Sequence, residues 1–136
     1  MSWVVDTCVL IDVLEDDPSF GRASADVLEK SLRDGLVLCP ITMVELSPAF
    51  AGNLEIQKHF LDQVGIDFTE AWTVADTECA YRAWNLYVQA RRGSDTPKRP
   101  LADLLIGAFA CRQQGLITRN PTDFRRWFPR LKLRQP

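Results

Sequence analysis

Four acidic side chains in this 136-residue chain are the groups best placed to do chemistry. They are Asp6, Glu45, Asp103 and Asp123. Ligands of an open parallel α/β sheet gather beyond the carboxyl ends of its strands, so we expect all four carboxylates to reach one rim of such a sheet. Clustered carboxylates repel one another and raise one another's pKa, and a bound cation relieves that repulsion.

The other reactive residue types narrow the choice of cation. His59 is the only histidine, and the four cysteines form no C-x-x-C pair, which argues against a zinc site, a disulfide framework and most histidine-based acid–base chemistry. Carboxylate oxygens without such neighbours favour Mg²⁺, with Mn²⁺ as the alternative. A metal of this kind lowers the pKa of bound water and stabilises the oxygen that departs from a phosphodiester.

Asp103 is the most informative of the four. It is the only charge in the predicted helix 101–114 before Arg112, and the helix is apolar on nearly every side. Interaction with the helix dipole would contribute only ~0.3–1 kcal/mol. A buried carboxylate is far more costly than that unless it is paired or metal-bound, so we favour a functional role, with Gly107 leaving space beside it.

The remaining acidic residues also have structural interpretations. Asp6 follows an apolar stretch and could end a strand or cap a helix. Glu45 stands three residues after Thr42, which is the spacing of a capping box. Asp123 lies at a predicted helix start, where N-terminal capping competes with a role in a site.

Charge is divided unevenly along the chain. Residues 1–90 carry 5 basic and 15 acidic side chains, whereas residues 91–136 carry 11 basic and 3 acidic ones. The C-terminal third could therefore present a cationic face to a polyanion such as RNA. Neutralisation of one half of the chain by the other is the alternative, and charge alone favours neither.

Short apolar runs alternate with helical patterns, which predicts a parallel sheet covered by helices on both faces in a single α/β domain over residues 1–136. Helices are predicted within 8–14, 20–34, 42–46, 53–64, 75–92, 101–114 and 123–127. Strands are predicted at 3–5, 36–39, 67–68 and 116–118, with an edge strand at 131–133.

The apolar runs are much shorter than the ~18 residues of a membrane span. The first residues, Met1-Ser2-Trp3, contain neither a basic segment nor a small-residue cleavage site. We therefore expect no export signal, no membrane association and a cytoplasmic location.

Four segments, VVDTCVLIDVL, TMVEL, PLADLLIGAFA and LITRNPTDF, resemble in order and spacing the PIN-domain ribonucleases, and among them the VapC-type toxins. The resemblance covers essentially the whole chain. It implies a three-layer fold with a five-stranded parallel sheet between helices. It also implies metal-dependent endoribonuclease activity that leaves 5′-phosphate and 3′-hydroxyl ends, a homodimer, and an antitoxin whose C-terminal segment blocks the site.

The same resemblance assigns roles to individual residues. It implies that Asp6 and Asp103 bind the metal directly, while Glu45 and Asp123 act through water. The implied supporting polar groups are Thr7, Thr118 and Asn120. The candidate RNA contacts are Lys98, Arg99, Arg119, Arg125 and Arg126.

Two functions other than a nuclease fit parts of the sequence. A phosphatase of the haloacid-dehalogenase type needs a second Asp two residues after the first, and position 8 is Cys. A catalytically silent PIN-like module that binds protein or RNA remains the alternative to a nuclease.

Overall fold

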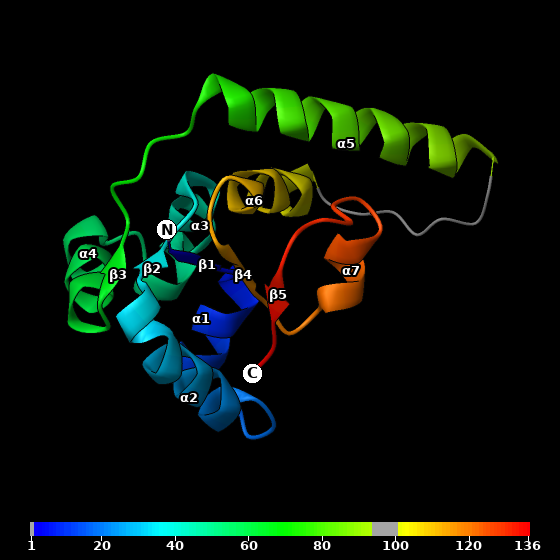
Figure 1. Ribbon diagram of the computed structural model, residues 1–136. Coiled ribbons are helices and arrows are strands. Elements are labelled where there is room, and N and C mark those ends of the chain that lie inside the picture. Colours follow the sequence, from blue (N-terminus) through cyan, green and yellow to red (C-terminus); the bar gives the residue numbers. More distant parts are fainter. Residues whose placement is uncertain (1, 94–100) are drawn as a thin grey trace.

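The computed structural model describes residues 2–93 and 101–136, which form a five-stranded parallel sheet between two layers of helices (Figure 1). The strands lie in the order β3-β2-β1-β4-β5, and every neighbouring pair is parallel. This confirms the predicted fold class. The strands are β1 (Trp3–Val5), β2 (Leu36–Val37), β3 (Ile66–Asp67), β4 (Gly115–Ile117) and β5 (Leu133–Arg134).

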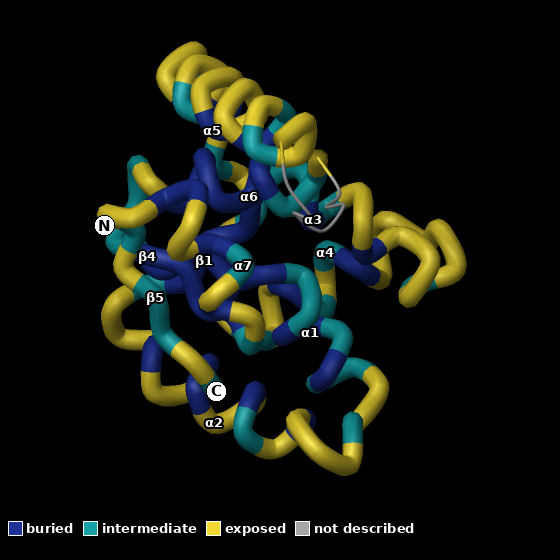
Figure 2. Tube along the Cα trace, turned by 90° about the vertical axis from the view of Figure 1, so that its right-hand side faces the viewer, coloured by how far each residue is buried: buried dark blue, intermediate teal, exposed yellow. Residues whose placement is uncertain are grey.

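The alternation of side chains along the strands creates two separate cores. Trp3 and Val5 of β1 point to one face of the sheet and Val4 to the other, because successive side chains in a strand point to opposite faces. Val4 is in register with Val37 of β2 and Leu116 of β4, and all three belong to the same core. Figure 2 shows β1 and β4 buried between the two layers.

Each core is covered by its own helices. α1, α2 and α4 pack on the face that contains Trp3 and Val5, whereas α5, α6 and α7 pack on the face of Val4. In the described part of the chain, no helix is both long enough and apolar enough to cross a membrane. The α-helices are α1 (Thr7–Leu14), α2 (Gly21–Ser31), α3 (Pro40–Glu45), α4 (Leu54–Gln63), α5 (Val74–Gly93), α6 (Leu101–Cys111) and α7 (Pro121–Arg125).

Four helices, α1, α3, α5 and α7, begin one or two residues earlier than predicted. Asp6 is the N-cap of α1, and its Oδ1 accepts a hydrogen bond of 2.9 Å from the backbone N–H of Thr7. α3 starts at Pro40, where the missing N–H of proline does no harm. Glu45 is therefore the last residue of α3, and the capping box with Thr42 is not formed.

α6 is buried on most sides, as its composition predicts. The space beside Gly107 does not belong to Asp103, however. A methyl group at position 107 would overlap the ring of Phe128, so the glycine allows the C-terminal segment to pack against α6. The prediction that this glycine makes room for the carboxylate was wrong.

Candidate active site at the carboxyl edge of the sheet

Asp6 and Thr118 meet where two neighbouring strands end. Val5 of β1 is in register with Ile117 of β4, and each of the two polar residues follows directly. The Thr118 hydroxyl donates a hydrogen bond of 2.7 Å to Asp6 Oδ2. The structure thus brings together two residues 112 positions apart, at the edge of the sheet where the sequence places the site.

The Asp6 carboxylate is almost fully buried, with 6% of the residue exposed. Its other partners are the backbone N–H of Thr7 and the thiol of Cys8, which donates to Oδ2 at 3.4 Å. Burial raises the pKa of Asp6, and the negative charge of Glu45 adds to that rise. The three hydrogen bonds lower the pKa without cancelling the effect. Among the described residues, no hydrogen-bond partner of Asp6 carries a positive charge.

Glu45 reaches the same place from α3. The Thr7 hydroxyl donates to Glu45 Oε1 at 2.7 Å and shares a hydrogen bond of 3.0 Å with the buried hydroxyl of Thr42. Thr7 therefore connects two carboxylates, since its backbone N–H binds Asp6 while its side chain binds Glu45. Two like charges held this way favour a cation between or beside them.

Cys8 and Asn120 complete this group. The Asn120 backbone N–H donates to Thr118 Oγ1 at 3.1 Å, and its side-chain amide lies 4.0 Å from Cys8 Sγ. Asn120 was predicted as a supporting residue. Cys8 was not, because cysteines outside a metal-binding or disulfide pattern are predicted to be small buried apolar side chains. Its position two residues after Asp6, in the first turn of α1, is the signal that could have identified it.

Asp103 and Asp123 lie in the first turns of α6 and α7, respectively, and both are half-buried. α6 packs against α3, whose last residue is Glu45, and against α7. Over residues 2–93 and 101–136, no three His, Cys, Asp or Glu side chains form a group ready to hold a metal ion. The convergence of all four carboxylates remains a prediction.

Comparison with known proteins decides the family. The model of the PIN domain matches residues 3–127, which is nearly the whole chain. The chain belongs to the PIN-domain family. A crystal structure of VapBC2 from Rickettsia felis, bound to a DNA fragment from their promoter, shares the fold. The TM-score is 0.73 at 17% identity, and the match covers 99% of this chain and 98% of the other. A search of curated proteins gives no match.

The part of the candidate site that contains Asp6 and Glu45 suits a hard divalent cation in this PIN domain. Asp6 is a buried anion surrounded by neutral donors, and a second carboxylate lies one threonine away. Oxygen ligands of this type are those of Mg²⁺ and Mn²⁺. A cation bound here would offset the desolvation of Asp6 and its repulsion by Glu45.

A second buried carboxylate of the PIN domain has a different role. On the predicted helix 8–14 Asp12 faces away from Asp6, which predicts exposure to solvent, but only 2% of the residue is accessible. Its Oδ2 accepts hydrogen bonds from Arg119 Nε at 2.9 Å and from the Ser24 hydroxyl at 3.2 Å. The Arg119 guanidinium also lies over the ring of Phe20, 4.6 Å from its centroid. Arg119 therefore ties α1 to the turn after β4, and its predicted contact with RNA remains untested.

The other candidate RNA contacts fall into two groups. Arg125 and Arg126 are exposed at the end of α7, and the Arg126 guanidinium lies over the Trp127 ring, 4.7 Å from its centroid. Trp127 itself is buried, so its main role is to anchor the C-terminal segment. Lys98 and Arg99 lie outside the described residues.

Proposed function

We propose that this PIN domain is a metal-dependent endoribonuclease and the toxin of a VapBC-type toxin–antitoxin pair. PIN domains are generally nucleases. The observation that carries the proposal is the Asp6 carboxylate, which is buried at the rim of the sheet among neutral donors and connected through Thr7 to Glu45. An anion in this setting needs a cation, and an oxygen-ligated divalent cation is suited to phosphodiester hydrolysis.

Each residue then has a defined task. Asp6 and Asp103 hold the ion directly, while Glu45 and Asp123 bind its water ligands. Mg²⁺, or Mn²⁺ in its place, supplies an acidified water and stabilises negative charge on the phosphate. Packing of α6 against both α3 and α7 supports this assignment, because those helices carry the other acidic residues.

The hydroxyl groups fix the orientation of the carboxylates. Thr118 donates to one oxygen of Asp6, and the backbone of Thr7 donates to the other. Thr7 holds Glu45 through its side chain. Ligands fixed in this way need little rearrangement when the ion binds. Asn120 supports the group through its hydrogen bond to Thr118.

RNA is the polyanion that suits the basic C-terminal third of the chain. Arg125 and Arg126 are exposed near Asp123, in the same short helix or just after it. Lys98 and Arg99 precede the helix that carries Asp103 in the sequence. Phosphate contacts of this kind release counterions, so binding of RNA should weaken steeply as salt is added.

The proposal includes an antitoxin as partner and the cytoplasm as the place of action. The structurally similar VapBC2 of Rickettsia felis was solved as a complex bound to a DNA fragment from their promoter. If this chain is a toxin of the same kind, a small DNA-binding protein encoded next to it should co-purify with it and inhibit it. A neighbouring gene product that neither binds nor inhibits would argue against the toxin role.

The proposal also includes a homodimer, for which α5 and α6 supply an apolar groove. Its volume is about 470 Å³, and its lining includes Trp72, Tyr81, Trp84 and Leu101. Tyr81 is 76% exposed, although it lies on a helix whose opposite side is packed. Apolar surfaces of this kind commonly mark protein interfaces.

Light scattering on the purified chain tests the dimer. Tyr81→Ser together with Trp84→Asp should yield monomers, whereas Ile56→Ser, an exposed apolar position on α4, should leave the mass unchanged. A wild-type monomer at all concentrations would remove this part of the proposal without affecting the nuclease assignment.

Incubation of a structured RNA with the wild type and with Asp103→Asn, in Mg²⁺ or in EDTA, tests the activity. Cleavage is expected only for the wild type in Mg²⁺, and Asp62→Asn, an exposed carboxylate on α4, should cleave like the wild type. Equal RNA decay in every sample would refute the nuclease. A silent module would bind RNA without cutting it.

Manganese binding gives a readout independent of activity. Electron paramagnetic resonance should show Mn²⁺ bound by the wild type and bound much more weakly by Asp103→Asn. The Asp62→Asn control should bind Mn²⁺ like the wild type.

A further inference from the structure

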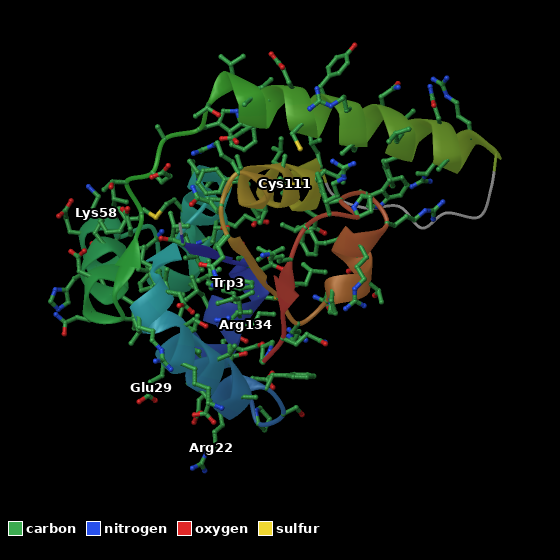
Figure 3. All side chains as sticks on the ribbon, in the orientation of Figure 1. Trp3, Arg22, Glu29, Lys58, Cys111 and Arg134 are labelled. Atoms are coloured by element: carbon green, nitrogen blue, oxygen red, sulfur yellow. The ribbon has the colours of Figure 1, made fainter. Side chains whose placement is uncertain are left out.

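α5 and α6 lie side by side, and each contributes one cysteine to their contact (Figure 1). Cys79 lies in the second turn of α5 and is half-buried, while Cys111 is the last residue of α6 and is exposed. Figure 3 shows Cys111 on α6, next to α5. The pair is outside the carboxylate site, and nothing in the proposed nuclease reaction uses it.

The two thiols lie at the same point of the α5–α6 contact. The Cys79 side chain is close enough to influence the ionisation of the Cys111 thiol, although the two residues belong to different helices. Small residues in the helix contact, Ala80 and Ala83 on α5, allow the two backbones to approach closely. Disulfides require such an approach, with Cα atoms usually 4.4–6.8 Å apart in proteins.

A neighbouring ion pair fixes the register of the two helices at this point. Arg112, directly after Cys111, donates from Nε to Asp76 Oδ1 and from Nη2 to Asp76 Oδ2, both at 3.0 Å. Asp76 lies three residues before Cys79 on α5, and residues at this spacing share one face of a helix. A two-pronged ion pair next to the thiols therefore limits sliding of α6 along α5.

We propose that Cys79 and Cys111 are a redox-active thiol pair that forms a reversible intrachain disulfide between α5 and α6. The oxidant is a low-molecular-weight disulfide such as oxidised glutathione. One protein thiolate attacks it, breaks its S–S bond and releases one reduced glutathione. The second protein thiol then attacks the mixed disulfide and releases the other, and both thiol protons pass to the departing thiolates.

The environment of Cys111 makes the pair slow to oxidise. Although the residue as a whole is exposed, desolvation of its thiol, together with the nearby Cys79 thiol and the negative charge of Asp76, raises the pKa of Cys111 to about 12. Few Cys111 thiolates exist near neutral pH, so this residue suits the second step, in which its target sulfur is held next to it. The bond should therefore form under sustained oxidation rather than on brief exposure.

The cross-link has a stabilising effect without touching the candidate active site. It closes a long segment, residues 79–111, and thereby restricts the unfolded chain. Asp103 lies at the opposite end of α6 from Cys111, two turns of helix away. The disulfide should thus raise the melting temperature, by roughly 5–15 °C, and should form whether or not the chain cuts RNA.

The test uses the full chain incubated with excess oxidised glutathione and then analysed by intact mass and peptide mapping. The expected product has lost two hydrogens, contains a Cys79–Cys111 peptide, melts at a higher temperature and reverts with dithiothreitol. Cys111→Ser should instead retain one glutathione on Cys79, the residue that makes the first attack, and show no rise in melting temperature. Ser94→Ala is a matched control that keeps both thiols and should behave like the wild type.

Three results would overturn the proposal that Cys79 and Cys111 form a redox-active pair. They are a wild-type product that keeps glutathione on Cys79 without closing the bond, a disulfide between two chains, and a thiol form that survives the treatment unchanged.

Discussion

Asp6 and Asp76 are both carboxylates removed from water, but the protein treats them in opposite ways. The side chain of Asp76 is 1% exposed and is bound by the guanidinium of Arg112. Asp6 is also buried, but in the part of the chain that the structure describes it accepts hydrogen bonds only from neutral groups. Burial raises the pKa of Asp6. For Asp76, burial alone would also raise the pKa, but hydrogen bonds from Arg112 and Thr73 outweigh it and lower the pKa.

The difference separates a structural carboxylate from one that we propose to be functional. Asp76 receives its cation from Arg112, the residue directly after α6, so this ion pair forms when the chain folds. Asp12 follows the same pattern with Arg119. Asp6 has no such partner within residues 2–93 and 101–136 and has Glu45 nearby, so we propose that a bound cation balances its charge. The variants below test whether the two carboxylates really differ in this way.

Asp6→Asn should have the largest effect, on activity. The amide keeps the size of the side chain and can still cap α1, but it removes the charge that holds the metal. Cleavage of RNA in Mg²⁺ should fall by at least about 100-fold, since even groups that only orient metal ligands commonly contribute 10–100-fold. Asp62→Asn is the control, and activity retained within a few-fold by Asp6→Asn would contradict the assignment.

Arg112→Met should have the largest effect on stability. The substitution leaves Asp76 buried without its cation, which should lower the free energy of unfolding by about 2–3 kcal/mol. This value is smaller than is usual when a fully buried ion pair is broken, because the Arg112 side chain is 31% exposed. Urea unfolding measures the change. Arg22→Met, on the surface of α2 where Figure 3 shows the side chain directed away from the protein, should have little effect.

The double variant Arg112→Met with Asp76→Asn sharpens this result. Removing the orphaned charge should recover part of the lost stability, since the penalty comes from an unpaired anion. A double variant less stable than Arg112→Met alone would show that Asp76 contributes through its other contacts, such as the hydrogen bond from the Thr73 backbone.

Without metal, Asp6→Asn should leave stability unchanged or raise the melting temperature by a few degrees. The substitution removes a desolvated charge and its repulsion by Glu45. Thermal melts in EDTA measure the effect, with Asp103→Asn in parallel. A clearly lower midpoint for both variants would show that these carboxylates stabilise the fold themselves.

The pH dependence of Asp76 should give the smallest effect. Its pKa is lower in the folded protein than in the unfolded chain, so the ion pair stabilises the fold above the ordinary carboxyl pKa near 3.8. That contribution is lost as the pH falls through the lowered value. The difference in unfolding free energy between the wild type and Asp76→Asn should shrink from pH 7 to pH 3, and a constant difference would argue against a charged pair.

The sequence is sufficient to predict the sheet and the rim because both follow from local patterns. Asp6 and Thr118 directly follow buried strands, and parallel strands place their carboxyl ends together. The Asp76–Arg112 pair was not predicted. Both residues look like ordinary surface charges, and their contact depends on how α5 packs on α6. Asp12 was mispredicted for the same reason, since its partner lies 107 residues away.

The short strands give this sheet almost no tolerance for misalignment. β1 has three residues, and Asp6 comes immediately after the last of them. A shift of its pairing by a single position would turn the Trp3 and Val5 side chains toward the opposite helix layer. It would also draw Asp6 into the hydrogen-bonded part of the sheet. The same few hydrogen bonds therefore secure both the pairing of the strands during folding and the position of Asp6 in the proposed active site.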